Sequence, residues 1–333
     1  MRLPWGDISS VAALFLAGKR FGVVGCLSAE ERCLGVPVEL GPRAEPETVM
    51  VVVHDPEDAF PDYTDETRKK VAEHERRLRE AGVHFEKREV TLLANDDDIL
   101  DLCRPIETGC LGETIVLDVT SLPKRFFCFM LKRLCRADAV PNVVATYTGS
   151  AGYTSDHLAA DPLPPDNLPG FGGPPPPPTP NTTLVLSLGF ESLNLASLLD
   201  IHSREARDLR FIVPYPPDGQ SMQRCWETLY AVLRGVADRA RDRIDVVAGW
   251  DCEQVYRVLW RLHGDADGLA FAPFGPKPHS MAMALFAIKH DVGLYYTQPR
   301  AYHPDYSTGR GSTWAYVVKW DGVPCYERLR QAP

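Results

Sequence analysis

The sequence predicts an α/β protein made of two tandem doubly wound units, and three observations lead to this prediction. Short apolar runs alternate with helix-like segments along most of the 333 residues. The same order of elements occurs twice, once before and once after a proline-rich stretch at 162–181. The apolar runs are continuous, which is typical of parallel strands that are covered on both faces.

The N-terminal segment "MRLPWGDISSVAALFLAGKRFG" contains one short apolar run, from Val11 to Ala17. Asp7 precedes this run and no convincing small-residue cleavage pattern follows it, so we predict an amphipathic helix and not a signal peptide. No apolar run approaches the roughly 20 residues that a membrane helix needs. We therefore expect a cytoplasmic protein with no membrane partner.

The two halves begin in the same way. Segments 20–40 and 182–201 each pass from an apolar run, through a small-residue turn with a glutamate, into a helix-like segment. Second strands follow at 48–60 and 208–220, then helices, then third strands at 83–93 and 243–249. Glu30 of the first half aligns with Glu191 of the second half, 161 residues later.

The later parts of the two halves align without gaps. "ETIVLDVTSLPKRFFCFMLKRL" (113–134) matches "DGLAFAPFGPKPHSMAMALFAI" (267–288) at an offset of 154 residues. Residues 143–153 match 292–302, with Thr148 opposite Thr297 at an offset of 149. Few identities survive, so a chance likeness of two generic α/β units is the alternative. The shared order and the similar offsets favour an internal duplication of two Rossmann-like units.

These patterns give the expected domain boundaries. Residues 1–161 form the first unit, 162–181 form a linker, and 182–333 form the second unit. Proline lacks a backbone donor and favours polyproline II, so the linker is expected to be a semi-rigid connector outside the sheets. Near the C-terminus, two strand-like runs surround Asp321 and Gly322, which predicts an appended β-hairpin at the end of the second unit.

Composition narrows the classes of function. A formal charge of −9 argues against a general nucleic-acid coat, which needs a broad basic surface, but not against a local basic pocket. The nine cysteines include no Cys-x-x-Cys pair, and most lie in apolar runs, so we expect reduced, structural thiols. No closely spaced Cys/His pairs suggest zinc, and we assign no metal and no cofactor.

Polar residues gather at the expected strand-to-helix corners, where ligands of parallel sheets bind. A helix that starts there directs free N–H groups and partial positive charge at the same point, which suits phosphate. Proline in the first turn is compatible with this, which accounts for Pro123 and Pro278. The candidate ligand-binding residues are Glu30, Asp118, Thr120, Ser121 and Lys124 in the first half, and Glu191, Lys277, His279, Ser280, Thr297 and Arg300 in the second.

Structural roles are the alternative for each of these residues. Thr120, Ser121 and Ser280 are of the type that caps helices. Asp118 would then only tie a loop, and the two aligned glutamates would only complement helix dipoles. Lys277 would be a solvated loop lysine.

The stretch "DVTSLPK", from Asp118 to Lys124, resembles the Asp/Asn-x-Ser/Thr-x-x-x-Lys/Arg motif of CARF domains. Two such units in one chain are similar to SAVED domains. The resemblance implies a sensor of a nucleotide or cyclic-oligonucleotide second messenger in a bacterial antiphage defence system. It also implies that the residues of the second half face those of the first across one ligand. The second half departs from the motif, because Ala272 and Phe274 replace the acid and the threonine.

Three functions follow as hypotheses. The first is a binding module for a small phosphorylated ligand, with a protein partner that supplies an effector activity, or as a homo-oligomer. The second is a metal-dependent phosphoryl or phosphodiester hydrolase, in which Glu30, Asp55, Asp58 and Asp118 converge on Mg²⁺. The third is a scaffold subunit with vestigial clefts. No catalytic residue is assigned, and we favour the binding module over an enzyme.

Overall fold

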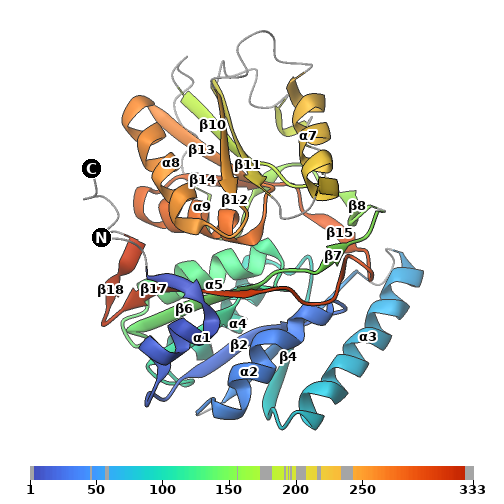
Figure 1. Ribbon diagram of the computed structural model, residues 1–333, viewed down its shortest axis with the longest axis vertical. Helices are drawn as coiled ribbons and strands as arrows, with labels where there is room; N and C mark the ends of the chain where they lie inside the picture. The colour runs from blue at the N-terminus through green and yellow to red at the C-terminus, as the bar shows by residue number, and fades with distance from the viewer. Residues whose placement is uncertain are drawn as a thin grey trace. The chain divides into compact units, whose positions relative to one another are not determined.

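The computed structural model describes residues 4–45, 47–56, 60–155, 157–172, 182–190, 193, 195, 197–199, 208–215, 219–233 and 243–326. The chain divides into two compact units (Figure 1). The first contains residues 1–161 and 300–333, and the second contains residues 162–299. The second unit is therefore an insertion within the first.

The first unit is built on an eight-stranded sheet in the order β1-β17-β6-β5-β2-β3-β4, with β18 paired to β17. Its strands are β1 (Trp5–Asp7), β2 (Gly22–Leu27), β3 (Thr48–His54), β4 (Phe85–Thr91), β5 (Thr114–Asp118), β6 (Asn142–Thr148), β17 (Thr313–Trp320) and β18 (Val323–Pro324). The five strands β2 to β6 are parallel, and β17 is antiparallel to β6. Numbered along the chain, the parallel strands lie in the order 3-2-1-4-5 of a Rossmann half.

The second unit repeats this topology in a six-stranded sheet of order β12-β11-β10-β13-β14-β9. Its strands are β9 (Asp166–Asn167), β10 (Thr182–Ser187), β11 (Asp208–Tyr215), β12 (Ile244–Ala248), β13 (Gly268–Pro273) and β14 (Gly293–Tyr296). Strands β10 to β14 are parallel and again lie in the order 3-2-1-4-5, with an antiparallel strand beside the fifth. The predicted pair of Rossmann-like α/β units is confirmed.

Helices connect the parallel strands in both units. In the first unit these are α1 (Ile8–Val11), α2 (Gly35–Leu40), α3 (Pro61–Glu80), α4 (Asp96–Glu107) and α5 (Lys124–Arg136), with short η1 (Ala12–Leu16), η2 (Glu31–Leu34) and η3 (Gly41–Arg43). In the second they are α7 (Gly219–Leu233), α8 (Cys252–Asp265) and α9 (Lys277–His290). Helices α5 and α9 start in the same way: Pro123 (φ −57°, ψ 150°) and Pro276 (φ −54°, ψ 154°) precede a lysine.

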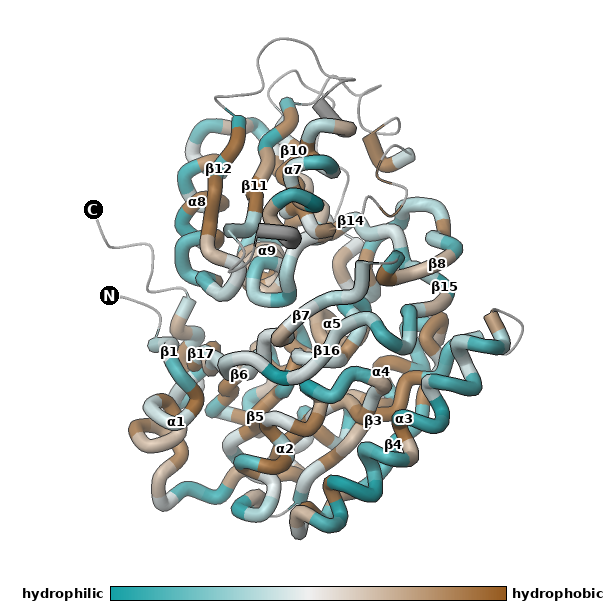
Figure 2. The backbone as a smooth tube through the Cα atoms, turned by 45° about the vertical axis from the view of Figure 1, so that its right-hand side comes forward, coloured by the Kyte–Doolittle hydropathy of each residue, from teal (hydrophilic) through white to brown (hydrophobic). Residues whose placement is uncertain are grey.

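The core of each unit follows the apolar runs of its sequence. Every residue of β2, β5 and β6 is buried, as expected for strands covered on both faces. Helix α3 is the opposite case: it buries only Thr64, His74 and Leu78, and its remaining surface is polar (Figure 2). Strand β4 ends the first sheet and carries consecutive charged residues, Glu86 to Glu89, within "FEKREVT", which protects an edge from unwanted pairing.

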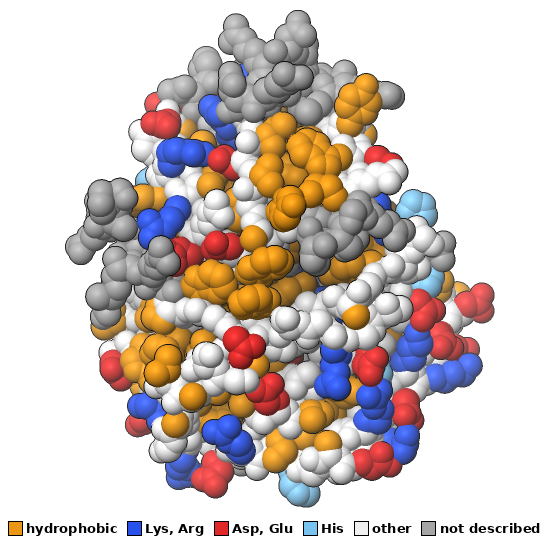
Figure 3. Space-filling model, viewed as in Figure 1, with side chains coloured by type: hydrophobic (Ala, Val, Ile, Leu, Met, Phe, Trp, Pro, Cys, Tyr) orange, Lys and Arg blue, Asp and Glu red, His pale blue; other side chains and the backbone are white. Residues whose placement is uncertain are grey.

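The corresponding edge of the second sheet is less polar. Strand β12 ends that sheet, and its Val246 is 48% exposed. Trp226 and Tyr230 of α7 are also exposed, at 42% and 60%. Figure 3 shows apolar side chains gathered over α7 and the neighbouring strands. The two edge strands at equivalent positions thus differ in their surface chemistry.

The C-terminal ribbon is placed differently from the expectation. We expected residues 300–333 in the second unit, but β17 lies in the first sheet, between β6 and β1. Its Trp314 and Tyr316 pack on Trp5, with ring centroids 5.7 and 6.1 Å apart. The reason is the open edge of β6, which the long apolar strand β17 covers. The predicted hairpin itself is confirmed, since β17 pairs with β18 around Asp321 (φ 49°) and Gly322 (φ 76°).

The expected linker also contributes to sheets. Strand β8 (Ala159–Pro162) pairs with β15 (Pro299–Tyr302), and β9 pairs with β14 through Asp166 and Asn167. Prolines are tolerated next to such edge strands because the side facing away from the sheet needs no donor. Residues 173–181 of the expected linker lie outside the described residues.

Candidate functional site

The loop after β5 is the part of the first unit that matches the CARF-like motif. Asp118 is 1% exposed, and its carboxylate accepts hydrogen bonds from the backbone N–H of Thr120 (3.2 Å), the Thr120 hydroxyl and the Thr146 hydroxyl (3.2 Å). The Thr120 hydroxyl oxygen in turn accepts from the backbone N–H of Thr148 (2.8 Å). Asp118 and Thr120 therefore hold the loop against the end of β6.

Three polar side chains gather at the start of α5, and two of them contain a buried atom without a hydrogen-bond partner. Ser121 is 7% exposed, and its hydroxyl has no hydrogen-bond partner. Lys124, the first residue of the helix, is 8% exposed. Arg125 donates to the carbonyl oxygens of Leu92 (3.0 Å) and Ala94 (2.6 Å), but its Nε has no partner.

The charges at this helix end are unusual. The N-terminus of a helix carries partial positive charge and favours acidic residues. The first turn of α5 contains none, and it begins with two cations. Burial lowers the pKa of Arg125 because a desolvated charge is disfavoured. The buried hydroxyl, the two cations and the helix N-terminus together suit an anion.

Glu30 belongs to a second cluster at the same edge of the sheet. Its Oε2 lies 2.7 Å from Nη2 and 2.8 Å from Nε of Arg32, which is 3% exposed. Nη1 of Arg32 donates to the Tyr147 hydroxyl (3.3 Å) and to the carbonyl oxygen of Thr148 (3.4 Å). Burial opposes the charge of Arg32, but Glu30 and the neighbouring tyrosines outweigh it and raise the pKa of the guanidinium. Sequence reasoning missed Arg32, because a single arginine in the short helical turn η2 has no pattern.

A C-terminal segment, residues 302–308, lies against this cluster, and we call it the strap. Ser307 donates to Oε2 of Glu30 (2.7 Å), and the ring of Tyr306 lies 5.9 Å from the Arg32 guanidinium. Within the strap, β16 (Ser307–Thr308) pairs with β7 (Gly152–Tyr153) (Figure 2). Further along, Lys70 of α3 pairs with Asp305 at 2.5 Å.

The equivalent corner of the second unit is filled by its own groups. His279 is fully buried, with Nδ1 3.1 Å from the Ser187 hydroxyl and Nε2 2.9 Å from the carbonyl oxygen of Ala248. Ser280 is also fully buried and donates to the carbonyl oxygen of Pro276 (3.2 Å). A Cβ atom on Gly275 would lie 2.0 Å from the Ser187 hydroxyl, so the two loops are in direct contact.

The remaining candidate residues of the second half each have their own surroundings. Lys277 is half-buried at the first position of α9, where it is the structural counterpart of Lys124. Thr297 is fully buried and donates to the carbonyl oxygen of Leu193. Arg300 lies on β15 of the first unit and pairs with Asp161 at 3.3 Å. Glu191 lies outside the described residues.

The structure thus brings together five candidates, Glu30, Asp118, Thr120, Ser121 and Lys124, at the carboxyl edge of the first sheet. The loop that contains Thr120 and Ser121 is linked to Arg32 through one residue, because Thr148 donates its N–H to Thr120 and its carbonyl oxygen accepts from Arg32. Contact of the second-unit candidates with a ligand stays a prediction.

The acids of the hydrolase hypothesis have other surroundings. Glu30 is paired with Arg32, and Asp118 accepts hydroxyl hydrogen bonds. Burial raises the pKa of Asp55 to about 6, and Asp58 lies outside the described residues. Across the ranges that the structure describes, no three His, Cys, Asp or Glu side chains form a group suited to a metal ion.

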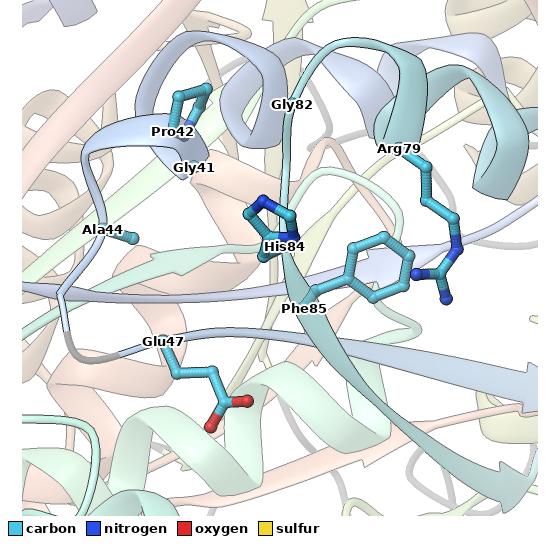
Figure 4. Close-up of a pocket in the computed structure, with 8 residues that line it drawn as sticks. All are labelled: Gly41, Pro42, Ala44, Glu47, Arg79, Gly82, His84 and Phe85. Atoms are coloured by element: carbon cyan, nitrogen blue, oxygen red, sulfur yellow. The ribbon is translucent and has the colours of Figure 1, made fainter.

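A cavity of about 330 Å³ lies at the opposite, amino edge of the first sheet (Figure 4). It is lined by Gly41, Pro42, Ala44, Glu47, Arg79, Gly82, His84 and Phe85. Glu47 and His84 precede β3 and β4, so this cavity is remote from the carboxyl ends and contains none of the candidate residues. The described polar cluster, and not this cavity, is the candidate site.

Comparison with known proteins assigns no family to the chain. No protein-family model and no curated protein sequence matches the chain. Among solved structures, the crystal structure of a GsuK mutant is 11% identical, with a TM-score of 0.19, over 85% of this chain and 77% of that one. Among the described residues, no helix has both the length and the apolar character to span a membrane.

Proposed function

We propose that the protein binds a small phosphorylated ligand at the carboxyl edge of the first sheet, and that this ligand is a nucleotide or cyclic oligonucleotide. The observation that carries the proposal is the start of α5, where Ser121, Lys124 and Arg125 are buried or half-buried around a helix N-terminus with no acid in its first turn. Phosphate supplies negative charge for the two cations and an acceptor for the Ser121 hydroxyl.

The location supports the same class of ligand. In parallel sheets of this strand order, ligands bind beyond the carboxyl ends where the strand order reverses, between the first and fourth strands. In the first unit these strands are β2 and β5, and the loops that follow them contain Glu30 and the motif from Asp118 to Lys124.

The CARF-like motif supports the cyclic-oligonucleotide part of the proposal. A sensor of this kind passes ligand binding to an effector, so the protein would act with a partner or as a homo-oligomer in a bacterial antiphage defence system. Ligand binding by Lys277, the counterpart of Lys124 in the second unit, is part of this proposal.

Thermal unfolding and calorimetry with a panel of cyclic di-, tri- and tetranucleotides test the proposal. A ligand at 100 times its Kd stabilises the folded state by about 2.7 kcal/mol, a shift of roughly 5 °C or more. Lys124→Met should remove most of this shift, because a charged hydrogen bond to phosphate contributes about 1.5–3 kcal/mol. Lys132→Met, on the same helix but two turns further on, is the matched control and should keep the shift. A panel that never raises the melting temperature of the wild type would refute the proposed ligand class.

A further inference from the structure

Arg32 is a buried cation with one acidic partner, located at the edge where the ligand is proposed to bind. Its side chain is 3% exposed, and Glu30 is 15% exposed. Removing such a pair from water costs several kcal/mol per ion, and stability alone is a poor reason for keeping one. Because the pair lies within the proposed site, a role in ligand binding is the alternative reason for keeping it.

The contact between the two groups has the geometry of anion recognition. Nε and Nη2 form one edge of the guanidinium fork, the edge that binds phosphate oxygens in pairs. In this structure both atoms approach the same oxygen, Oε2 of Glu30, at 2.8 and 2.7 Å. The carboxylate therefore occupies the place that a phosphate oxygen would take.

The strap depends on the same oxygen atom. Ser307 donates its hydroxyl hydrogen bond to Oε2 of Glu30, and Tyr306 lies over the guanidinium. The rest of the strap is held independently, by the pair of Lys70 with Asp305 and by the packing of His303 on Tyr63, with ring centroids 4.9 Å apart. The Ser307 end is also held by the pairing of β16 with β7, so loss of Glu30 from its position would remove one of several contacts that hold the strap.

We propose that Arg32 is a phosphate-binding residue of the site, that Glu30 is its internal substitute for the ligand, and that the strap closes over this pair when no ligand is bound. The identity of the ligand rests on the proposed function. A phosphate on Arg32 displaces Glu30 and with it the hydrogen bond from Ser307. Ligand on Arg32 and the hydrogen bond between the strap and Glu30 therefore exclude each other, so ligand binding shifts the strap toward a state without that contact.

Glu30→Gln tests this inference with inorganic phosphate as the probe. The variant keeps the shape of the side chain but leaves the buried guanidinium without its counter-charge. We expect its melting temperature to fall by roughly 10 °C in phosphate-free buffer, and phosphate to restore most of the loss. The wild type should gain only a small fraction of that shift, since Glu30 already occupies Arg32.

Two further variants make the result specific. Glu31→Gln is the matched control, because Glu31 pairs at 3.1 Å with Arg77, and both side chains are more than one-third exposed. It should lower the melting temperature little and show no phosphate rescue. The double variant Glu30→Gln/Arg32→Gln should lose the rescue. The inference is wrong if phosphate stabilises the double variant as strongly as it stabilises Glu30→Gln. It is also wrong if phosphate fails to stabilise Glu30→Gln.

Ser307→Ala gives a second measurement that leaves the buried ion pair in place. Amide hydrogen exchange in residues 302–308 should become faster, and phosphate should bind roughly 3- to 10-fold more tightly, because one contact of the closed state is lost. Unchanged exchange together with unchanged affinity refutes the role of the strap. Nucleotide binding by the wild type without phosphate rescue of Glu30→Gln refutes this inference alone. Rescue without nucleotide binding refutes the proposed ligand and retains Arg32 as a phosphate-binding residue.

Discussion

Ser121→Ala should stabilise the ligand-free protein and weaken its binding of ligand. The Ser121 hydroxyl is buried without a hydrogen-bond partner, although the residue lies in a loop at the carboxyl edge of the sheet. An unsatisfied buried hydroxyl costs about 1–3 kcal/mol relative to its state in water. Alanine removes that cost and leaves a void of one oxygen atom, so we expect a net gain of about 1 kcal/mol.

The same substitution removes a donor that the proposed ligand would use. A hydrogen bond from a hydroxyl to a charged phosphate contributes about 1.5–3 kcal/mol, so the Kd should rise roughly 10- to 100-fold. Thermal unfolding without ligand measures the first effect, as a rise of about 2–4 °C in melting temperature. Isothermal calorimetry with the best cyclic nucleotide of the panel measures the second.

Thr48→Val is the matched control for this experiment. The Thr48 hydroxyl is also buried without a partner, but Thr48 begins β3 at the amino edge of the sheet. Its removal should raise stability by a similar amount and leave the Kd unchanged. A Ser121→Ala protein that is less stable than the wild type, or a Thr48→Val protein that loses affinity equally, would refute the assignment of Ser121 to an anion site.

Three other predictions concern the packing and charge of the two units. Gly275→Ala places a Cβ atom 2.0 Å from a serine hydroxyl and 2.9 Å from a backbone carbonyl oxygen. Urea unfolding should therefore show that the unfolding free energy falls by about 2–4 kcal/mol. Gly264→Ala is the control: it lies in open space within α8 and should be neutral or stabilising by up to about 1 kcal/mol. Burial raises the folded-state pKa of Asp55 to about 6. Its contribution to stability is therefore present below about pH 4 and is lost as the pH rises through 6. Asp55→Asn should flatten the pH dependence of the unfolding free energy between these two pH values. His279→Ala should destabilise the protein by about 3 kcal/mol, because it empties a fully buried site with two hydrogen bonds. Lys277→Ala should change the ligand-free melting temperature little. It should reduce the rise in melting temperature that a bound cyclic nucleotide produces.

The strands and their repetition in two units could be predicted to a large extent, because local sequence carries the relevant information. Each parallel strand is a continuous apolar run, and the repeat of such runs on both sides of a proline-rich stretch predicts two similar units. The position of β17 could not be predicted in this way. Its sequence indicates a strand, but the sheet that it joins depends on which edge remains open in the folded protein, and β6 offers that edge 165 residues earlier in the chain.

The candidate site was predicted less completely. The motif from Asp118 to Lys124 does mark the corner at the start of α5, yet Asp118 and Thr120 bond to each other and to β6, as the alternative reading of a tied loop anticipated. Arg32 and Arg125 have no sequence pattern that distinguishes them from other surface arginines. Their importance comes from burial, and burial depends on side chains that the chain brings together from distant positions.

The insertion of one unit within the other has a consequence for folding during synthesis. The second unit spans one continuous stretch of chain and can form its sheet as soon as residue 299 has left the ribosome. The first unit must wait, since β17 adds to β6 only after the C-terminal residues emerge, and until then the nascent chain exposes an unpaired apolar edge. A released chain truncated shortly after residue 300 would therefore contain the whole inner unit and an aggregation-prone outer one, and supplying β17 in trans as a peptide should rescue the latter.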